Sequence, residues 1–113
     1  QNRGLGMYLQ EDIEAWAAAK GIYNYGSFTA QIKVLAEESI EATEAYCYHK
    51  IERTQQARDQ LEKELGDIYV TWINACKVAN MDPEICAYKA VKKNANRQGN
   101  MVNGRFVKDT IDD

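Results

Sequence analysis

The sequence has little of the residues that interrupt helices, with one proline and seven glycines among 113 residues. Because proline and glycine mark most turns, their scarcity argues against many short strands and favours a few long helices. The chain also lacks an apolar run near the ~20 residues that a membrane span requires, so we expect no membrane partner. Its length indicates a single domain, residues 1–113, whose modest core self-association would extend.

Cysteine, histidine and excess basic charge are scarce as well. The three cysteines are an odd number without a close pair, which argues against a disulfide framework. Since no leader pattern is present, we expect a cytoplasmic protein with reduced thiols. The formal net charge of −3 lacks the strong basicity of a nucleic-acid coat. We therefore expect no nucleic-acid polymer as a partner.

Four long helices and a terminal hairpin are expected along the chain. Apolar residues at helical spacing and capping residues predict helices over residues 7–20, 27–48, 61–79 and 83–97. We expect a loop at residues 21–27 and a turn near residues 52–54. Asn103 and Gly104 between short apolar runs predict a type I′ hairpin. The expected fold class is therefore all-α, a four-helix bundle with a short C-terminal β-hairpin. The apolar residues around the third helix indicate that it is buried on most sides, which favours an oligomer.

Two pairs of carboxylates fall on neighbouring helices. Glu38 and Glu41 lie three residues apart in the second helix, and Glu64 and Asp67 lie three apart in the third. Residues at this spacing share one helix face. An antiparallel connection that turns near residues 52–53 places Glu38 level with Asp67 and Glu41 level with Glu64. The sequence therefore predicts that four carboxylates converge at one height.

Like charges that converge in this way are costly without a cation. Oxygen donors without cysteine or histidine favour Mg²⁺, with Mn²⁺ as a substitute. The absence of Glu-x-x-His pairs argues against a di-iron site. The alternative is that both acidic pairs lie on ordinary solvated helix faces. Gly66 favours the metal site, because a glycine inside a helix costs ~1 kcal/mol unless a close approach to a helix or ligand offsets that cost.

Four segments, in this order, carry a family resemblance: residues 16–22 (WAAAKGI), 33–41 (KVLAEESIE), 64–67 (ELGD) and 93–108, with KNANR at its start. Together they resemble small bacterial and phage-borne members of the MazG-like all-α nucleoside triphosphate pyrophosphohydrolases. The resemblance implies Mg²⁺-dependent hydrolysis of nucleoside or deoxynucleoside triphosphates to the monophosphate and pyrophosphate, often to cleanse nucleotide pools. It also implies a homodimer or a dimer-of-dimers tetramer.

The resemblance implies roles for individual residues. Its metal ligands are Glu38, Glu41, Glu64 and Asp67. Glu37 is a further ligand or orients water, and either Glu37 or Glu38 is the general base. Lys93 and Arg97 would meet the triphosphate, although both could instead complement the dipole at a helix C-terminus.

The nucleobase also needs a binding site. Candidates for stacking on it are Trp16, which we favour, and Tyr23, Tyr25 and Trp72. Asn74 could read a base edge. Two other functions stay open: a non-catalytic helical dimerisation module, and a pyrophosphatase of the same superfamily specific for dCTP, dUTP or phosphoribosyl-ATP.

Overall fold

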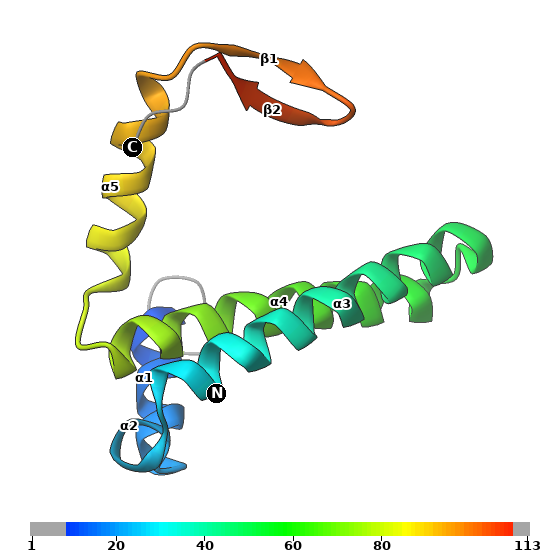
Figure 1. Cartoon of the computed structure of the whole chain (residues 1–113). Helices are drawn as coiled ribbons and strands as arrows, with labels where there is room; N and C mark the ends of the chain where they lie inside the picture. The colour runs from blue at the N-terminus through cyan, green and yellow to red at the C-terminus, as the bar shows by residue number, and fades with distance from the viewer. Residues whose placement is uncertain (1–8, 110–113) are drawn as a thin grey trace. The chain divides into compact units, whose positions relative to one another are not determined.

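The computed structural model describes residues 9–109, so the expected helix start at Met7 lies outside the described residues. Its elements are α1 (Leu9–Ala19), α2 (Ile22–Tyr25), α3 (Phe28–Glu52), α4 (Gln55–Val78), α5 (Pro83–Ala95), β1 (Gly99–Val102) and β2 (Arg105–Lys108) (Figure 1). The all-α class with a short C-terminal hairpin is confirmed. The chain divides into two compact units, Gln1–Met81 and Asp82–Asp113.

The first unit is built on the long antiparallel pair α3 and α4, which lie side by side (Figure 1). Each of these helices begins at a hydroxyl cap: the Ser27 Oγ accepts a hydrogen bond from the Ala30 N–H at 3.1 Å, and the Thr54 Oγ1 accepts from the Ala57 N–H at 3.1 Å. Between them, Arg53 takes a left-handed backbone conformation with φ of 53°. The turn therefore lies where the sequence predicts it, although the helices continue closer to it than expected.

The helices α1 and α2 pack on α4. Ile13 and Ala17, four residues apart on α1, are buried. The loop expected at residues 21–27 contains the short helix α2, which follows the left-handed Gly21 with φ of 83°. Burial concentrates near the C-terminal end of α4, at Thr71, Ile73, Asn74, Ala75 and Cys76. This end of α4 therefore holds most of the core that the first unit buries.

The second unit consists of α5 and the β1–β2 hairpin. The Asp82 Oδ1 caps α5 by accepting a hydrogen bond from the Glu84 N–H at 2.8 Å, and Pro83 follows as the first helical residue. The antiparallel strands pair Met101 with Phe106. Both turn residues, Asn103 and Gly104, have positive φ, at 51° and 83°. This is the type I′ geometry that the Asn-Gly pair predicts.

Much apolar surface stays exposed in this single chain. The fully buried side chains are mostly small, whereas Ile40 and Ile51 on α3 are 61% and 77% exposed. Such surface is unusual for a monomer and is compatible with the expected oligomer, which stays a prediction. Within residues 9–109, none of the helices combines the length and the apolar character that crossing a membrane requires.

Gly66 generates a prediction about stability. A methyl group built on Gly66, inside α4, would meet no atom within 4 Å apart from its chain neighbours and its own helix backbone. The close approach that was expected at this glycine is therefore absent among the described residues, and Gly66 lends no support to the metal site. Gly66→Ala should therefore stabilise the protein by ~1 kcal/mol through helix propensity, which raises the melting temperature by about 4 °C. Gly104→Ala is the matched control, because Gly104 is equally open but has φ of +83°; this change should lower stability. Thermal unfolding followed by circular dichroism measures both, and a lower melting temperature for Gly66→Ala would contradict the prediction.

Candidate metal centre

The structure brings carboxylates from α3 and α4 together. Glu38 and Glu41 lie one turn apart on α3, and Glu64 lies on the facing helix α4. One carboxylate oxygen from each of these three residues lies within 4.8 Å of the others. The arrangement follows from the i, i+3 spacing on α3 and from the antiparallel register that the turn sets. These three side chains can therefore share one cation.

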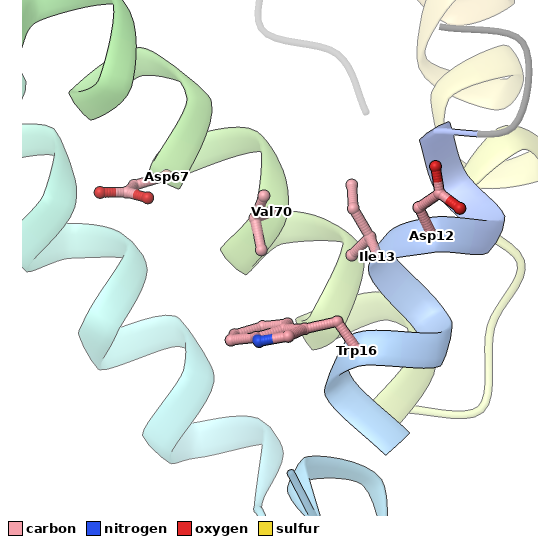
Figure 2. A pocket seen from close by; sticks show the side chains of 5 residues that line it. All are labelled: Asp12, Ile13, Trp16, Asp67 and Val70. Atoms are coloured by element: carbon pink, nitrogen blue, oxygen red, sulfur yellow. The ribbon is translucent and has the colours of Figure 1, made fainter. Parts of the chain in front are cut away.

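Asp67 lies one turn beyond Glu64 on α4 and belongs to the same electrostatic cluster. Among the charges that act on Glu38, that of Asp67 has the largest effect. Figure 2 shows the Asp67 carboxylate directed from α4 towards α3. The expected convergence of Glu38 and Asp67 is thus present in the geometry, although Asp67 lies outside the tight group of three oxygens.

The cluster raises the pKa of Glu38. The largest cause is desolvation, followed by the negative charges of Asp67, Glu41 and Glu64. A hydrogen bond between the side chains of Glu38 and Glu41 acts in the same direction. All these effects disfavour the ionised form of Glu38 when no cation is bound. A proton or a metal ion relieves this repulsion, so the two should compete for the site.

Two oxygens of the cluster lack hydrogen-bond donors. Within residues 9–109, Glu38 Oε1 and Glu64 Oε1 are shielded from solvent and accept no hydrogen bond. The other Glu64 oxygen, Oε2, accepts one from the Gln60 Nε2 at 2.6 Å. A buried carboxylate oxygen without a donor is costly. Because the donor set is all oxygen, the residues fit a hard divalent cation such as Mg²⁺ or Mn²⁺.

Glu37 lies beside Glu38 in sequence but is exposed on α3. Successive residues on a helix point about 100° apart, so Glu37 points away from Glu38, although it shares a helix face with Glu41, which lies four residues further on. Glu37 does not belong to the group of three converging oxygens. Its expected role as base or further ligand stays a prediction.

A cavity of about 300 Å³ borders the cluster in the same unit. It is lined by Asp12, Ile13, Trp16, Asp67 and Val70. Figure 2 shows the Trp16 indole extending from α1 towards α4, with Asp67 on the opposite wall. Trp16 is 48% exposed, so part of the residue is accessible to solvent. Asp67 therefore connects the carboxylate cluster to a cavity with an aromatic wall.

Residues 27–102 match the family model described as the MazG nucleotide pyrophosphohydrolase domain. The chain belongs to this family. The match spans α3, α4, α5 and β1, and it contains all four carboxylates together with Lys93 and Arg97. Comparisons with curated proteins and with solved structures found no match. Trp16 and Asp12 lie outside the part that matches the MazG domain.

The other expected base-binding residues of this MazG protein differ in accessibility. Asn74 is buried, and its Oδ1 accepts a hydrogen bond from the Tyr23 hydroxyl at 3.0 Å. Burial raises the pKa of Tyr23, and the charge of Glu14 adds to the effect. Trp72 is partly buried and tilted against Tyr69, with 6.4 Å between ring centroids. Tyr25 has 90% of its surface exposed.

The expected phosphate-binding residues of the MazG domain lie in the second unit: Lys93 is in the last turn of α5, and Arg97 follows two residues after the helix ends at Ala95. Lys93 is exposed, whereas Arg97 is partly buried. The Arg97 Nε is shielded from solvent and donates no hydrogen bond within residues 9–109. A cavity of about 500 Å³ in this unit is lined by Asn94, Arg97 and Phe106. The sequence analysis did not single out these two further cavity-lining residues, Asn94 and Phe106. The available signal was position: Asn94 lies in the basic segment KNANR, and Phe106 lies on β2 of the hairpin.

The carboxylate cluster generates a prediction about metal binding. Glu38→Gln should raise the melting temperature of the metal-free protein at neutral pH, because it removes one charge from a partly desolvated group of like charges. It should also abolish the rise in melting temperature with Mg²⁺, since a ligand is lost. Thermal unfolding in EDTA and in millimolar Mg²⁺ measures both effects. Glu44→Gln, at an exposed position on the same helix, is the control and should change neither.

The same variant checks the sign of the pH dependence. Because folding raises the pKa of Glu38, the protonated form favours the folded state. The metal-free wild type should therefore lose stability, relative to Glu38→Gln, as the pH rises from the ordinary glutamate pKa through the raised one. Below that range the difference should be small. A stability gap that widens towards acid, or an undiminished Mg²⁺ effect in Glu38→Gln, would contradict the assignment.

Proposed function

We propose that the protein hydrolyses nucleoside or deoxynucleoside triphosphates to the monophosphate and pyrophosphate with Mg²⁺, or with Mn²⁺ in its place. The observation that carries the proposal is the pair of shielded oxygens, Glu38 Oε1 and Glu64 Oε1, which have no hydrogen-bond donor within residues 9–109. They lie in a carboxylate cluster inside a MazG domain. On an ordinary solvated helix face, these carboxylate oxygens would be exposed to water.

The residues divide the chemistry between them. The metal would be held by four carboxylates, those of Glu38, Glu41, Glu64 and Asp67. When bound, the metal would neutralise charge on the phosphate oxygens. Water attacks the α-phosphorus, the bond from that phosphorus to the bridging oxygen breaks, and pyrophosphate leaves. Glu37 or Glu38 accepts the proton of the attacking water. Glu37 is exposed, whereas Glu38 belongs to the cluster itself.

The remaining site residues would bind the substrate. Lys93 and Arg97 would contact the triphosphate, and the unpartnered Arg97 Nε supports this role because guanidinium groups bind phosphate oxygens well. Trp16 would stack on the base, since its exposed ring lines a cavity that Asp67 also lines. Asn74 would contact a base edge through its amide N–H group, because its Oδ1 already accepts a hydrogen bond from the Tyr23 hydroxyl.

We further propose that the protein forms a homodimer or a dimer-of-dimers tetramer. Residues 1–113 would form one MazG domain. The protein would act in the cytoplasm and cleanse the nucleotide pool. The family match supports the single domain, because residues 27–102 extend across both compact units. The exposed Ile40 and Ile51 support self-association. Sedimentation equilibrium should therefore give at least twice the mass of the chain, and a monomer at micromolar concentration would contradict this.

Release of pyrophosphate tests the reaction. The wild type should release it from at least one nucleotide in a panel of NTPs, dNTPs and phosphoribosyl-ATP with Mg²⁺, and chelation by EDTA should stop the release. Glu64→Ala should lower the rate by at least ~100-fold while circular dichroism stays helical, because the change removes a ligand and not a core group. Glu62→Ala, two residues away in an exposed ion pair with Arg58, is the control.

The same panel separates the alternatives. Release from a single nucleotide, such as dCTP, dUTP or phosphoribosyl-ATP, would indicate a specific member of the superfamily. If no nucleotide gives pyrophosphate with either Mg²⁺ or Mn²⁺, the proposal fails and a non-catalytic helical module is favoured. Activity that Glu64→Ala leaves intact would show that the chemistry lies elsewhere.

A further inference from the structure

The two carboxylate oxygens of Glu64 have different surroundings. The Oε2 accepts a hydrogen bond from the Gln60 Nε2 at 2.6 Å. The Oε1 is shielded from solvent, and no described residue donates a hydrogen bond to it. One oxygen is thus committed to a neighbour on the same helix. The other keeps its lone pairs for a cation shared with Glu38 and Glu41.

Gln60 lies one turn before Glu64 on α4, where residues four apart share a helix face. An ionised carboxylate only accepts hydrogen bonds, so the Gln60 amide must present its NH₂ group and not its oxygen. Rotation about the last side-chain bond of Glu64 would exchange the two carboxylate oxygens. The hydrogen bond opposes this rotation, because turning away would break a short, charge-assisted contact. The carboxylate is therefore held with Oε1 as the oxygen that has no donor.

A second glutamine–carboxylate pair on α4 shows what is particular to Gln60. The Gln55 Nε2 donates to the Asp59 Oδ1 at 2.8 Å, again across four residues. Gln55 and Asp59 are both exposed, and Asp59 lies outside the group of three converging carboxylates. Their hydrogen bond is an ordinary helix-surface contact. The bond from Gln60 instead ends at a carboxylate whose second oxygen is shielded.

A third pair, on α1, has partners on both carboxylate oxygens. The Gln10 Nε2 donates to the Glu14 Oε2 at 2.8 Å, and the Glu14 Oε1 lies 3.8 Å from the Lys77 Nζ. Among these three pairs of the described chain, Glu64 alone combines a glutamine donor with a shielded second oxygen that has no partner.

The donor at this position is also uncharged. A lysine or arginine at position 60 would donate to Glu64 as well, but its positive charge would repel a divalent cation nearby. The neutral amide of Gln60 orients the carboxylate and leaves the negative potential of the cluster intact.

We propose that Gln60 is a positioning residue of the metal centre, whose amide holds the Glu64 carboxylate in the orientation that leaves Oε1 to the divalent cation. The inference rests on the proposed function, because it takes Glu64 as a metal ligand. Gln60 touches neither the cation nor the substrate and acts through Glu64.

Gln60→Met tests the role of the amide. The change removes the donor and keeps an unbranched side chain of similar length and helix propensity. Because Gln60 is exposed, the core of the first unit should be unaffected. Calorimetric titration with Mg²⁺ should give a dissociation constant about tenfold higher than that of the wild type.

Gln55→Met is the matched control, because it removes a hydrogen bond of the same kind and spacing from the same helix. It should leave the dissociation constant for Mg²⁺ unchanged. In EDTA, the two variants should have the same melting temperature. An equal loss of Mg²⁺ affinity in both variants would reveal a general effect on α4 and would overturn the inference.

The wild-type protein supplies a readout that does not depend on the folding of a variant. In proton–nitrogen correlation spectra, the side-chain amide signals of Gln60 should shift when Mg²⁺ is added, because the carboxylate to which they donate becomes coordinated. The side-chain amide signals of Gln55 should stay in place. If saturating Mg²⁺ moves neither pair of signals, Gln60 does not act on the metal site.

Activity separates this inference from the proposed reaction. If nucleotides are hydrolysed, Gln60→Met should raise the Mg²⁺ concentration for half-maximal rate about tenfold and leave the rate at saturating Mg²⁺ close to that of the wild type. If no nucleotide yields pyrophosphate but Mg²⁺ affinity depends on Gln60, the inference stands and the reaction fails. If pyrophosphate is released but Gln60→Met binds Mg²⁺ as tightly as the wild type, the inference is wrong and the reaction stands. If the wild type binds neither Mg²⁺ nor Mn²⁺, both are wrong.

Discussion

Repulsion among carboxylates on α3 and α4 is the constraint on which the site depends. Glu38, Glu41 and Glu64 approach within a few ångströms, and Asp67 adds to the field at Glu38. In a metal-free chain this arrangement opposes folding, because partial burial removes the water that would screen it. The fold tolerates the cost because the α3–α4 pair is held by caps at Ser27 and Thr54 and by a core outside the cluster. A divalent cation turns the same geometry from a cost into binding energy.

Much of this arrangement could be predicted from the sequence, because it depends on local signals. Ser27, Asp82 and the Asn103–Gly104 pair each fix a helix start or a turn through their own backbone chemistry. Once the turn at Arg53 is located, helical periodicity alone sets which residues of α3 and α4 lie level. The convergence of Glu38 with Asp67 required no knowledge of distant contacts, only an antiparallel register.

The features that sequence reasoning missed depend on contacts between distant segments. The short helix α2 forms where a loop was expected, and its Tyr23 donates a hydrogen bond to Asn74, which lies 51 positions away. No local pattern in either segment indicates this bond, so Asn74 looked available for a base. Asp12 drew no attention in the sequence, because the helix dipole alone explains an acidic residue in the first turn of a helix. Its place on a cavity wall emerges only when α1 packs on α4.

Asp67 connects the region that matches the MazG domain with α1, which precedes that region. The family match contains the carboxylate cluster but begins after α1. The matched residues alone would therefore account for the proposed phosphate site and would leave out Trp16, the proposed base-stacking residue. Asp67 faces the cluster and also lines the cavity that Trp16 and Asp12 complete. In the proposed reaction, a nucleotide whose phosphates lie at the cluster would place its base against Trp16. The proposed metal site and the proposed base site would thus share Asp67, which connects the cluster on α3 and α4 to the packing of α1 on α4.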